Sequence, residues 1–124
     1  MFEITVEETF SSGHALRGYR GKCENPHGHN YRVRVALTGP RLNSIGLLYD
    51  FKQLKTIIRE ETERLDHQYL NDLEPFRELN PSAENLARFL FERVREQLQH
   101  NPEGVTVRTV TVYETDITAA VYSE

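Results

Sequence analysis

The sequence has a single cysteine, no tryptophan, and no apolar run long enough to cross a membrane. One cysteine cannot form a disulfide within the chain, which suits a reducing compartment and leaves the thiol free for other uses. The apolar stretches fall well short of the roughly 20 residues that a bilayer needs, and residues 1–10 lack the basic start and apolar run of a secretory signal. We therefore expect a soluble, cytoplasmic protein.

Positive charge is also scarce, because 15 Lys and Arg residues stand against 19 Asp and Glu residues, for a formal net charge of −4. The chain has no basic run or aromatic-interleaved basic stripe of the kind that follows a phosphate backbone. These absences argue against a nucleic acid or a membrane as partner. With 124 residues, no internal repeat and no low-complexity linker, residues 1–124 are predicted to form one domain.

Four segments have the pattern of β-strands. Apolar and polar residues alternate over residues 2–8 and 29–39. Residues 105–115 and 117–123 are rich in β-branched side chains, and the Thr-Asp sequence at their junction indicates a hairpin. The apolar parity of the third segment shifts around Thr109, which indicates a bulge or a twist there.

Two segments between these strands have helical periodicity: residues 50–65 with Asp50 as the predicted N-cap, and residues 82–98 with Ser82 in that position. Their inward faces are predicted to carry Phe51, Leu54, Ile57, Ile58 and Leu65 in the first helix and Leu86, Phe89, Leu90, Val94 and Leu98 in the second. Strands first and last with helices between them predict an α+β fold, a four-stranded antiparallel sheet with two helices on one face, in the order ββααββ. The open edges of such a sheet favour subunit association.

Residues 23–31, CENPHGHNY, contain the cysteine and two histidines one residue apart. Alternate residues of an extended segment point the same way, so His27 and His29 share a face. His14 lies just beyond the first predicted strand, where an antiparallel neighbour could bring it to the same end of the sheet. Three neutral imidazoles with a fourth position open are typical of catalytic zinc sites. Two alternatives are open: Cys23 is the fourth ligand of a closed structural site, or it is a buried small apolar residue.

Two other polar features are candidates for function. Asp66 and His67 directly follow the first predicted helix, where the carboxylate could orient the imidazole for proton transfer; the alternative is a polar helix end stabilised by the helix dipole. Glu114 continues the parity of Val110 and Val112, so it is predicted to point toward the face that those valines bury. A carboxylate there needs hydrogen-bond donors from a partner or a ligand, whereas a glutamate at the strand end could instead reach solvent.

Six segments of the chain together resemble the family of 6-pyruvoyl-tetrahydropterin synthases and bacterial 6-carboxy-5,6,7,8-tetrahydropterin synthases. In order they are FSSGH, CENPHGHNY, LLYDFKQLK, LDHQYLN, NPSAENLA and VYET, and they extend over essentially the whole sequence. The resemblance implies the tunnelling fold (T-fold), in which each subunit contributes four antiparallel strands and two helices. It also implies that trimers close a barrel and that two trimers stack into a homohexamer.

The resemblance assigns roles to the candidate residues. It implies zinc binding by His14, His27 and His29, a catalytic base at Cys23, proton transfer assisted by Asp66 and His67, and a pterin anchor at Glu114. Members of the family build this pocket across a subunit interface, which implies that Cys23 and the Asp66–His67 pair of one site come from different chains.

Three residues separate Cys23 from His27, as in the bacterial carboxy-pterin enzymes, whereas the animal pyruvoyl-forming enzymes carry a longer insertion. The resemblance therefore favours conversion of 7,8-dihydroneopterin triphosphate to 6-carboxy-5,6,7,8-tetrahydropterin, acetaldehyde and triphosphate, a step toward queuosine and other 7-deazapurines. One alternative is a 6-pyruvoyl-tetrahydropterin synthase, which eliminates triphosphate from the same substrate. Another, of a different class, is a non-enzymatic zinc-stabilised assembly module with Cys23 as the fourth ligand.

Three charged residues near Cys23 have open assignments. Glu24 is an alternative base, because some relatives use a glutamate in the role of the cysteine. Arg20 and Lys22 are candidates for contact with the triphosphate, and their alternative is ordinary solvated surface charge.

Overall fold

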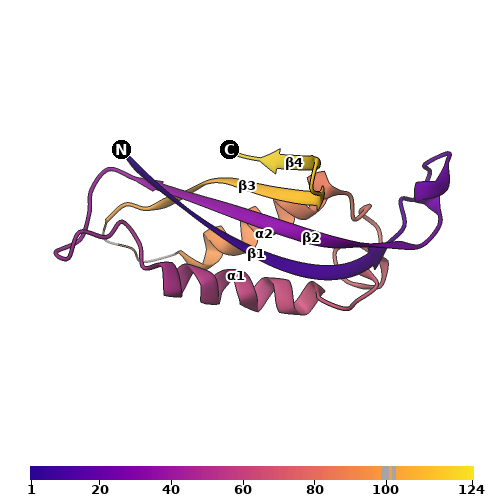
Figure 1. Cartoon of the computed structure of the whole chain (residues 1–124), viewed down its shortest axis with the longest axis horizontal. Coiled ribbons are helices and arrows are strands. Elements are labelled where there is room, and N and C mark those ends of the chain that lie inside the picture. Colours follow the sequence, from indigo (N-terminus) through magenta and orange to yellow (C-terminus); the bar gives the residue numbers. More distant parts are fainter. Residues whose placement is uncertain (99–100, 102) are drawn as a thin grey trace.

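Alternating apolar residues form the strands of one antiparallel sheet, whose strand order is β1-β2-β3-β4. The computed structural model describes residues 1–98, 101 and 103–124. The strands are β1 (Phe2–His14), β2 (His27–Gly39), β3 (Thr106–Thr115) and β4 (Thr118–Tyr122). Helices α1 (Phe51–Leu65) and α2 (Ala83–Gln97) connect β2 to β3, and both lie on the same face of the sheet (Figure 1). The predicted α+β fold is confirmed.

The register of the sheet gathers the apolar side chains on the face that the helices cover. Val6 pairs with Val35 and Phe10 pairs with Tyr31, and all four side chains are buried. Between β2 and β3 the register shifts, because Ala36 pairs with Thr109 while Leu37 pairs with Val107. Arg108 is therefore the extra residue of a bulge, which confirms the parity break predicted at this point.

The helices begin at the predicted caps. The Asp50 carboxylate accepts a hydrogen bond from the Lys52 backbone N–H at 2.7 Å, and the Ser82 hydroxyl accepts one from the Asn85 N–H at 3.1 Å. Nearly all of the predicted inward residues are buried or packed against the core. Phe51 is the exception: its prediction was wrong, because 54% of its surface is exposed in the first turn of α1.

The two helices are joined by a buried ion pair. Glu61 of α1 is fully buried, and its carboxylate accepts hydrogen bonds from Arg93 of α2 at 3.2 Å and 3.3 Å. Arg64 approaches the same carboxylate at 3.7 Å from an exposed position. Because taking a carboxylate out of water is costly, Arg93 has to compensate most of that cost.

We expect Arg93→Ala to lower the free energy of unfolding by about 3 kcal/mol, because it leaves the buried Glu61 carboxylate without its main partner. Arg88→Ala is the matched control, since Arg88 pairs with Glu92 on the exposed side of the same helix, where an ion pair contributes little to stability. Urea unfolding of the two variants at one protein concentration compares them. Equal destabilisation by both substitutions would contradict the conclusion that Arg93 compensates the cost of burying the Glu61 carboxylate.

The chain that follows α1 lies along the outer edge of β1. The His67 N–H donates to the Ser11 carbonyl at 2.6 Å, and the Gly13 N–H donates to the Gln68 carbonyl at 3.0 Å. Residues 66–69 thereby extend the sheet at the end where β1 meets β2. Within the described ranges, no helix is long and apolar enough to cross a bilayer.

Candidate active site

Three histidines meet where β1 ends and β2 begins. His14 is the last residue of β1, rather than a residue beyond it, and it pairs across the sheet with His27. His29 lies two residues further along β2, so all three side chains project from the face that also carries the core. Their ring centroids are 4.5 to 5.0 Å apart. The structure thus brings together the three residues predicted to bind zinc.

The hydrogen bonds of His14 and His27 define where their lone pairs point. The Nδ1 atom of His14 lies 2.7 Å from the Pro81 carbonyl oxygen, and Nδ1 of His27 lies 2.7 Å from that of Asn25. A carbonyl oxygen can only accept, so each Nδ1 carries a proton and each Nε2 of a neutral ring presents a lone pair. Carbonyl partners of this kind orient metal-binding histidines in many proteins.

These two lone pairs face each other, because the Nε2 atoms of His14 and His27 are only 2.9 Å apart. Such an approach is repulsive unless a cation, either a proton or a metal ion, lies between the two atoms. Burial lowers the pKa of His14, which disfavours the proton. The donor set therefore fits a metal ion that accepts both nitrogens.

Glu114 of β3 completes the cluster. Its Oε1 atom is 3.1 Å from Nε2 of His29, and the candidate ligand atoms of the three histidines and Glu114 all lie within 4.8 Å of one another. Burial lowers the pKa of His29. The predicted inward orientation of Glu114 is confirmed, and it is this carboxylate, not Cys23, that stands beside the histidines in the described part of the chain.

Tyr31 continues the face of His27 and His29 deeper into the core. Its ring is fully buried and stacks on Phe10 at a centroid distance of 4.8 Å. Among the described residues its hydroxyl has no hydrogen-bond partner, and burial together with the nearby Glu114 charge raises the pKa of Tyr31. Alternation predicts Tyr31 only as an apolar strand residue, although its parity with the two histidines could have indicated its place at the site.

Asp66 and His67 form an oriented pair of the kind that transfers protons. One Asp66 oxygen accepts from the Ser11 N–H at 2.8 Å, and the other lies 2.8 Å from Nδ1 of His67. These contacts, the Ser11 N–H first, hold the pKa of Asp66 below its usual range. His67 has a positive φ of 56°, an unusual conformation for a residue other than glycine, and 82% of its side chain is exposed.

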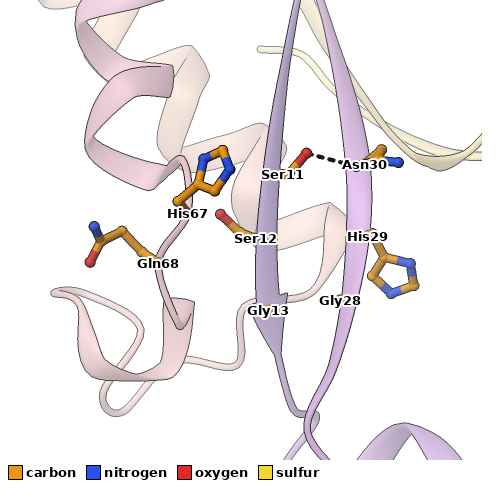
Figure 2. A pocket seen from close by; sticks show the side chains of 8 residues that line it. All are labelled: Ser11, Ser12, Gly13, Gly28, His29, Asn30, His67 and Gln68. Carbon is orange, nitrogen blue, oxygen red and sulfur yellow. Dashed lines mark hydrogen bonds between the residues drawn. The ribbon is translucent and has the colours of Figure 1, made fainter.

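The Asp66–His67 pair lies across β1 from the histidine cluster of its own chain. An open pocket of about 370 Å³ lies at this end of the sheet, and its lining includes both His29 and His67. Figure 2 shows the two rings on either side of the paired strands β1 and β2. Since residues 66–69 lie on the outer edge of β1 and His29 lies on β2, one whole strand separates them.

Cys23 lies in the loop that joins β1 to β2, in a short 3₁₀ helix (Lys22–Glu24). The residue is half-buried, and its carbonyl oxygen accepts a hydrogen bond from the Leu16 N–H at 2.9 Å. Among the described residues it lies outside the cluster of potential metal ligands. Arg20, Lys22 and Glu24 are exposed in the same loop, so the loop presents one half-buried thiol among solvated charges.

Sequence comparison finds relatives that cover most or all of the chain. Residues 3–124 match the sequence model of a family described as 6-pyruvoyl tetrahydropterin synthase. The 6-carboxy-5,6,7,8-tetrahydropterin synthase of Haemophilus influenzae is 30% identical, with full coverage of both chains. The human 6-pyruvoyl tetrahydrobiopterin synthase is 36% identical over 82% of this chain and 70% of its own length.

A solved structure shares the fold of this chain. The structure of Caenorhabditis elegans 6-pyruvoyl tetrahydropterin synthase superposes with a TM-score of 0.83 at 30% identity, covering 100% of this chain and 97% of that one. The strand order and the helix arrangement are therefore shared with proteins of known structure over the whole length.

Proposed function

The chain belongs to the 6-pyruvoyl tetrahydropterin synthase family, and on this basis we propose that it is a zinc-dependent lyase acting on 7,8-dihydroneopterin triphosphate. The proposed reaction consumes one water molecule and gives 6-carboxy-5,6,7,8-tetrahydropterin, acetaldehyde and triphosphate, in the route to queuosine. The observation that supports the proposal is the close approach of the Nε2 atoms of His14 and His27, 2.9 Å apart, which fits a cation held between them at this end of the sheet.

His14, His27 and His29 would hold the zinc ion through Nε2. The carbonyl groups of Pro81 and Asn25 keep the first two rings in the required tautomer, so the ligand set is preorganised. When bound, zinc supplies Lewis-acid polarisation of the oxygen atoms on the substrate side chain. That chemistry suits abstraction of a proton from the neighbouring carbon.

Cys23 would be the base that removes this proton. A thiol acts as a base only in its thiolate form, which a neighbouring cation stabilises. A zinc ion bound at the histidines or a protonated His67 could be that cation. His67 would return or relay the proton through its exposed Nε2, while Asp66 holds its Nδ1 at 2.8 Å. Arg20 and Lys22 are exposed on the same loop as Cys23 and remain candidates for the triphosphate.

Glu114 would anchor the pterin ring. A pterin presents adjacent N–H donors, and a carboxylate can accept two of them in parallel. The half-buried position of Glu114 beside His29 supports a role in the pocket rather than in solvent. We further propose a homo-oligomer, a hexamer built as a dimer of trimers, in which the Asp66–His67 pair of one chain completes the site of another.

We expect the zinc-loaded wild-type protein to convert 7,8-dihydroneopterin triphosphate to a carboxy-pterin and one equivalent of acetaldehyde, because the Cys23–His27 spacing matches the carboxy-forming relatives. Mass spectrometry of the pterin and a chemical assay for acetaldehyde measure the outcome, with chelator-treated protein as the control. A pyruvoyl product without the two-carbon fragment would favour the second candidate, which the similarity to the human enzyme supports. Zinc binding without any turnover would favour the assembly module.

A further inference from the structure

The loop that carries Cys23 projects beyond the end of the sheet (Figure 1). The pairing of β1 with β2 ends at His14 and His27, so residues 15–26 lie outside this ladder and are placed by other contacts. A misplacement of about 1 Å in a reacting group can cost about 100-fold in rate. The contacts that fix this loop therefore bear on the chemistry proposed for Cys23.

Two asparagine side chains hold the first residues of the loop. The Asn71 amide accepts from the Ala15 N–H and donates to the Ala15 carbonyl, both at 2.9 Å. The Asn80 amide makes the same two hydrogen bonds with Arg17, also at 2.9 Å each. An amide that accepts from and donates to one residue reproduces the pair of hydrogen bonds that a neighbouring strand would make. We call these four hydrogen bonds the asparagine clamp.

The residue between the two clamped positions holds Cys23 itself. The Leu16 N–H donates to the Cys23 carbonyl oxygen at 2.9 Å. The hydrogen bonds of residues 15–17 thus alternate between the asparagine clamp and the returning part of the loop, as successive residues of a strand bond to opposite neighbours. The position of Cys23 is thereby linked to the asparagine clamp through a single backbone residue.

The asparagine clamp belongs to the same part of the chain that orients His14. The carbonyl oxygen of Pro81, the residue after Asn80, accepts from Nδ1 of His14 at 2.7 Å. The Arg17 guanidinium adds a further link, because it donates to the Phe76 carbonyl at 2.7 Å. The loop of Cys23 and the histidine cluster are therefore attached to one support, which fixes their relative positions.

We propose that Asn71 and Asn80 are positioning residues for the Cys23 thiol. This inference rests on the proposed function, because it takes Cys23 as the base of the reaction. Neither asparagine has to contact the substrate, since each acts by holding the first residues of the loop in place. Loss of the asparagine clamp should therefore lower kcat and leave KM nearly unchanged.

The test uses Asn80→Ala, which removes half of the asparagine clamp at a half-buried position. Asn43→Ala is the matched control, because the Asn43 side chain also accepts backbone hydrogen bonds, from Ile45 and Leu47 at 3.0 Å each, in the loop at the opposite end of β2. Turnover of 7,8-dihydroneopterin triphosphate by the zinc-loaded proteins gives kcat and KM. Hydrogen–deuterium exchange of residues 15–25 measures the opening of the loop.

For Asn80→Ala we expect kcat to fall by about 10- to 100-fold, with KM within about twofold of the wild-type value. Exchange of residues 15–25 should become about tenfold faster, because two hydrogen bonds that oppose opening are lost. The bound zinc should be the same as in the wild type. Asn43→Ala should change none of these quantities.

A normal kcat in Asn80→Ala beside faster exchange would overturn the inference, because the asparagine clamp would then stabilise the loop without positioning a base. A lower kcat with unchanged exchange would overturn it too, since the effect would not pass through the loop. If Asn80→Ala fails to fold, Asn80→Asp replaces it, because aspartate keeps the acceptor for the Arg17 N–H and loses the donor. A wild type without turnover would instead contradict the proposed function, so the two failures are distinguishable.

Discussion

Cys23→Ala will lose turnover of 7,8-dihydroneopterin triphosphate while it retains bound zinc. As the proposed base, the thiol should be worth about 10²- to 10⁴-fold in rate. Its removal should leave the metal in place, because in the described residues the potential ligands are three histidines and Glu114, and Cys23 lies apart from them in the Lys22–Glu24 turn. Steady-state kinetics and metal analysis of the same preparations measure both effects.

Glu24→Gln is the matched control for this loss, because Glu24 is the adjacent residue in the same turn and is exposed. We expect Glu24→Gln to retain most of the wild-type rate. A reversed result, with activity in Cys23→Ala and none in Glu24→Gln, would transfer the role of base to the glutamate. Loss of zinc from Cys23→Ala would contradict both hypotheses, Cys23 as the base and Glu24 as the base. It would support a structural site in which the thiolate is a ligand.

Local patterns were sufficient to predict most of the fold and the histidines of the site. Alternation gave the strands, Asp50 and Ser82 marked the helix starts, and the parity break at Thr109 located a bulge. The spacing of His27 and His29 placed both on one face. These predictions succeeded because each depends on interactions within a few residues or on the two-residue period of a strand.

Other features depend on contacts between distant segments and were not predictable in the same way. Helical periodicity marks a face of α1 but does not show where the neighbouring elements end, so Phe51 was wrongly placed inside. The N–H of His67, whose φ is positive, donates to the Ser11 carbonyl, a contact across more than 50 residues. The orphan hydroxyl of Tyr31 likewise depends on what surrounds it in three dimensions.

The sheet topology gives a physical reason for expecting a shared active site. Residues 66–69 lie along one edge of β1, and the His27–His29 segment of β2 lies along the other edge. Two strand spacings, roughly 10 Å, therefore separate these two segments. The His67 ring is exposed, and it lies on the other side of the paired strands β1 and β2 from the His29 ring (Figure 2). A proton-transfer group in this position is available to a second chain docked on the edge of β1 rather than to the cluster of its own chain.

Mixed oligomers of Cys23→Ala and His67→Ala chains will therefore recover activity that neither variant has alone. In an equal mixture, half of the chains supply an intact Cys23, and half of their neighbours supply an intact His67, so about a quarter of the sites should be complete. The two variants can be co-expressed with different affinity tags and purified through both tags in succession. Turnover per zinc-loaded site is then compared with that of the wild type.

Cys23→Ala co-expressed with Cys23→Ser is the matched control, since no arrangement of those chains provides the thiol. If the Cys23→Ala and His67→Ala mixture is as inactive as this control, then Cys23 and His67 act within one chain. In that case the loop that carries Cys23 would have to fold back over β1 to reach His67, although among the described residues no hydrogen bond or ion pair joins the two side chains. Recovery near a quarter would instead show that His67, on the outer edge of the sheet, acts in the site of a neighbouring chain.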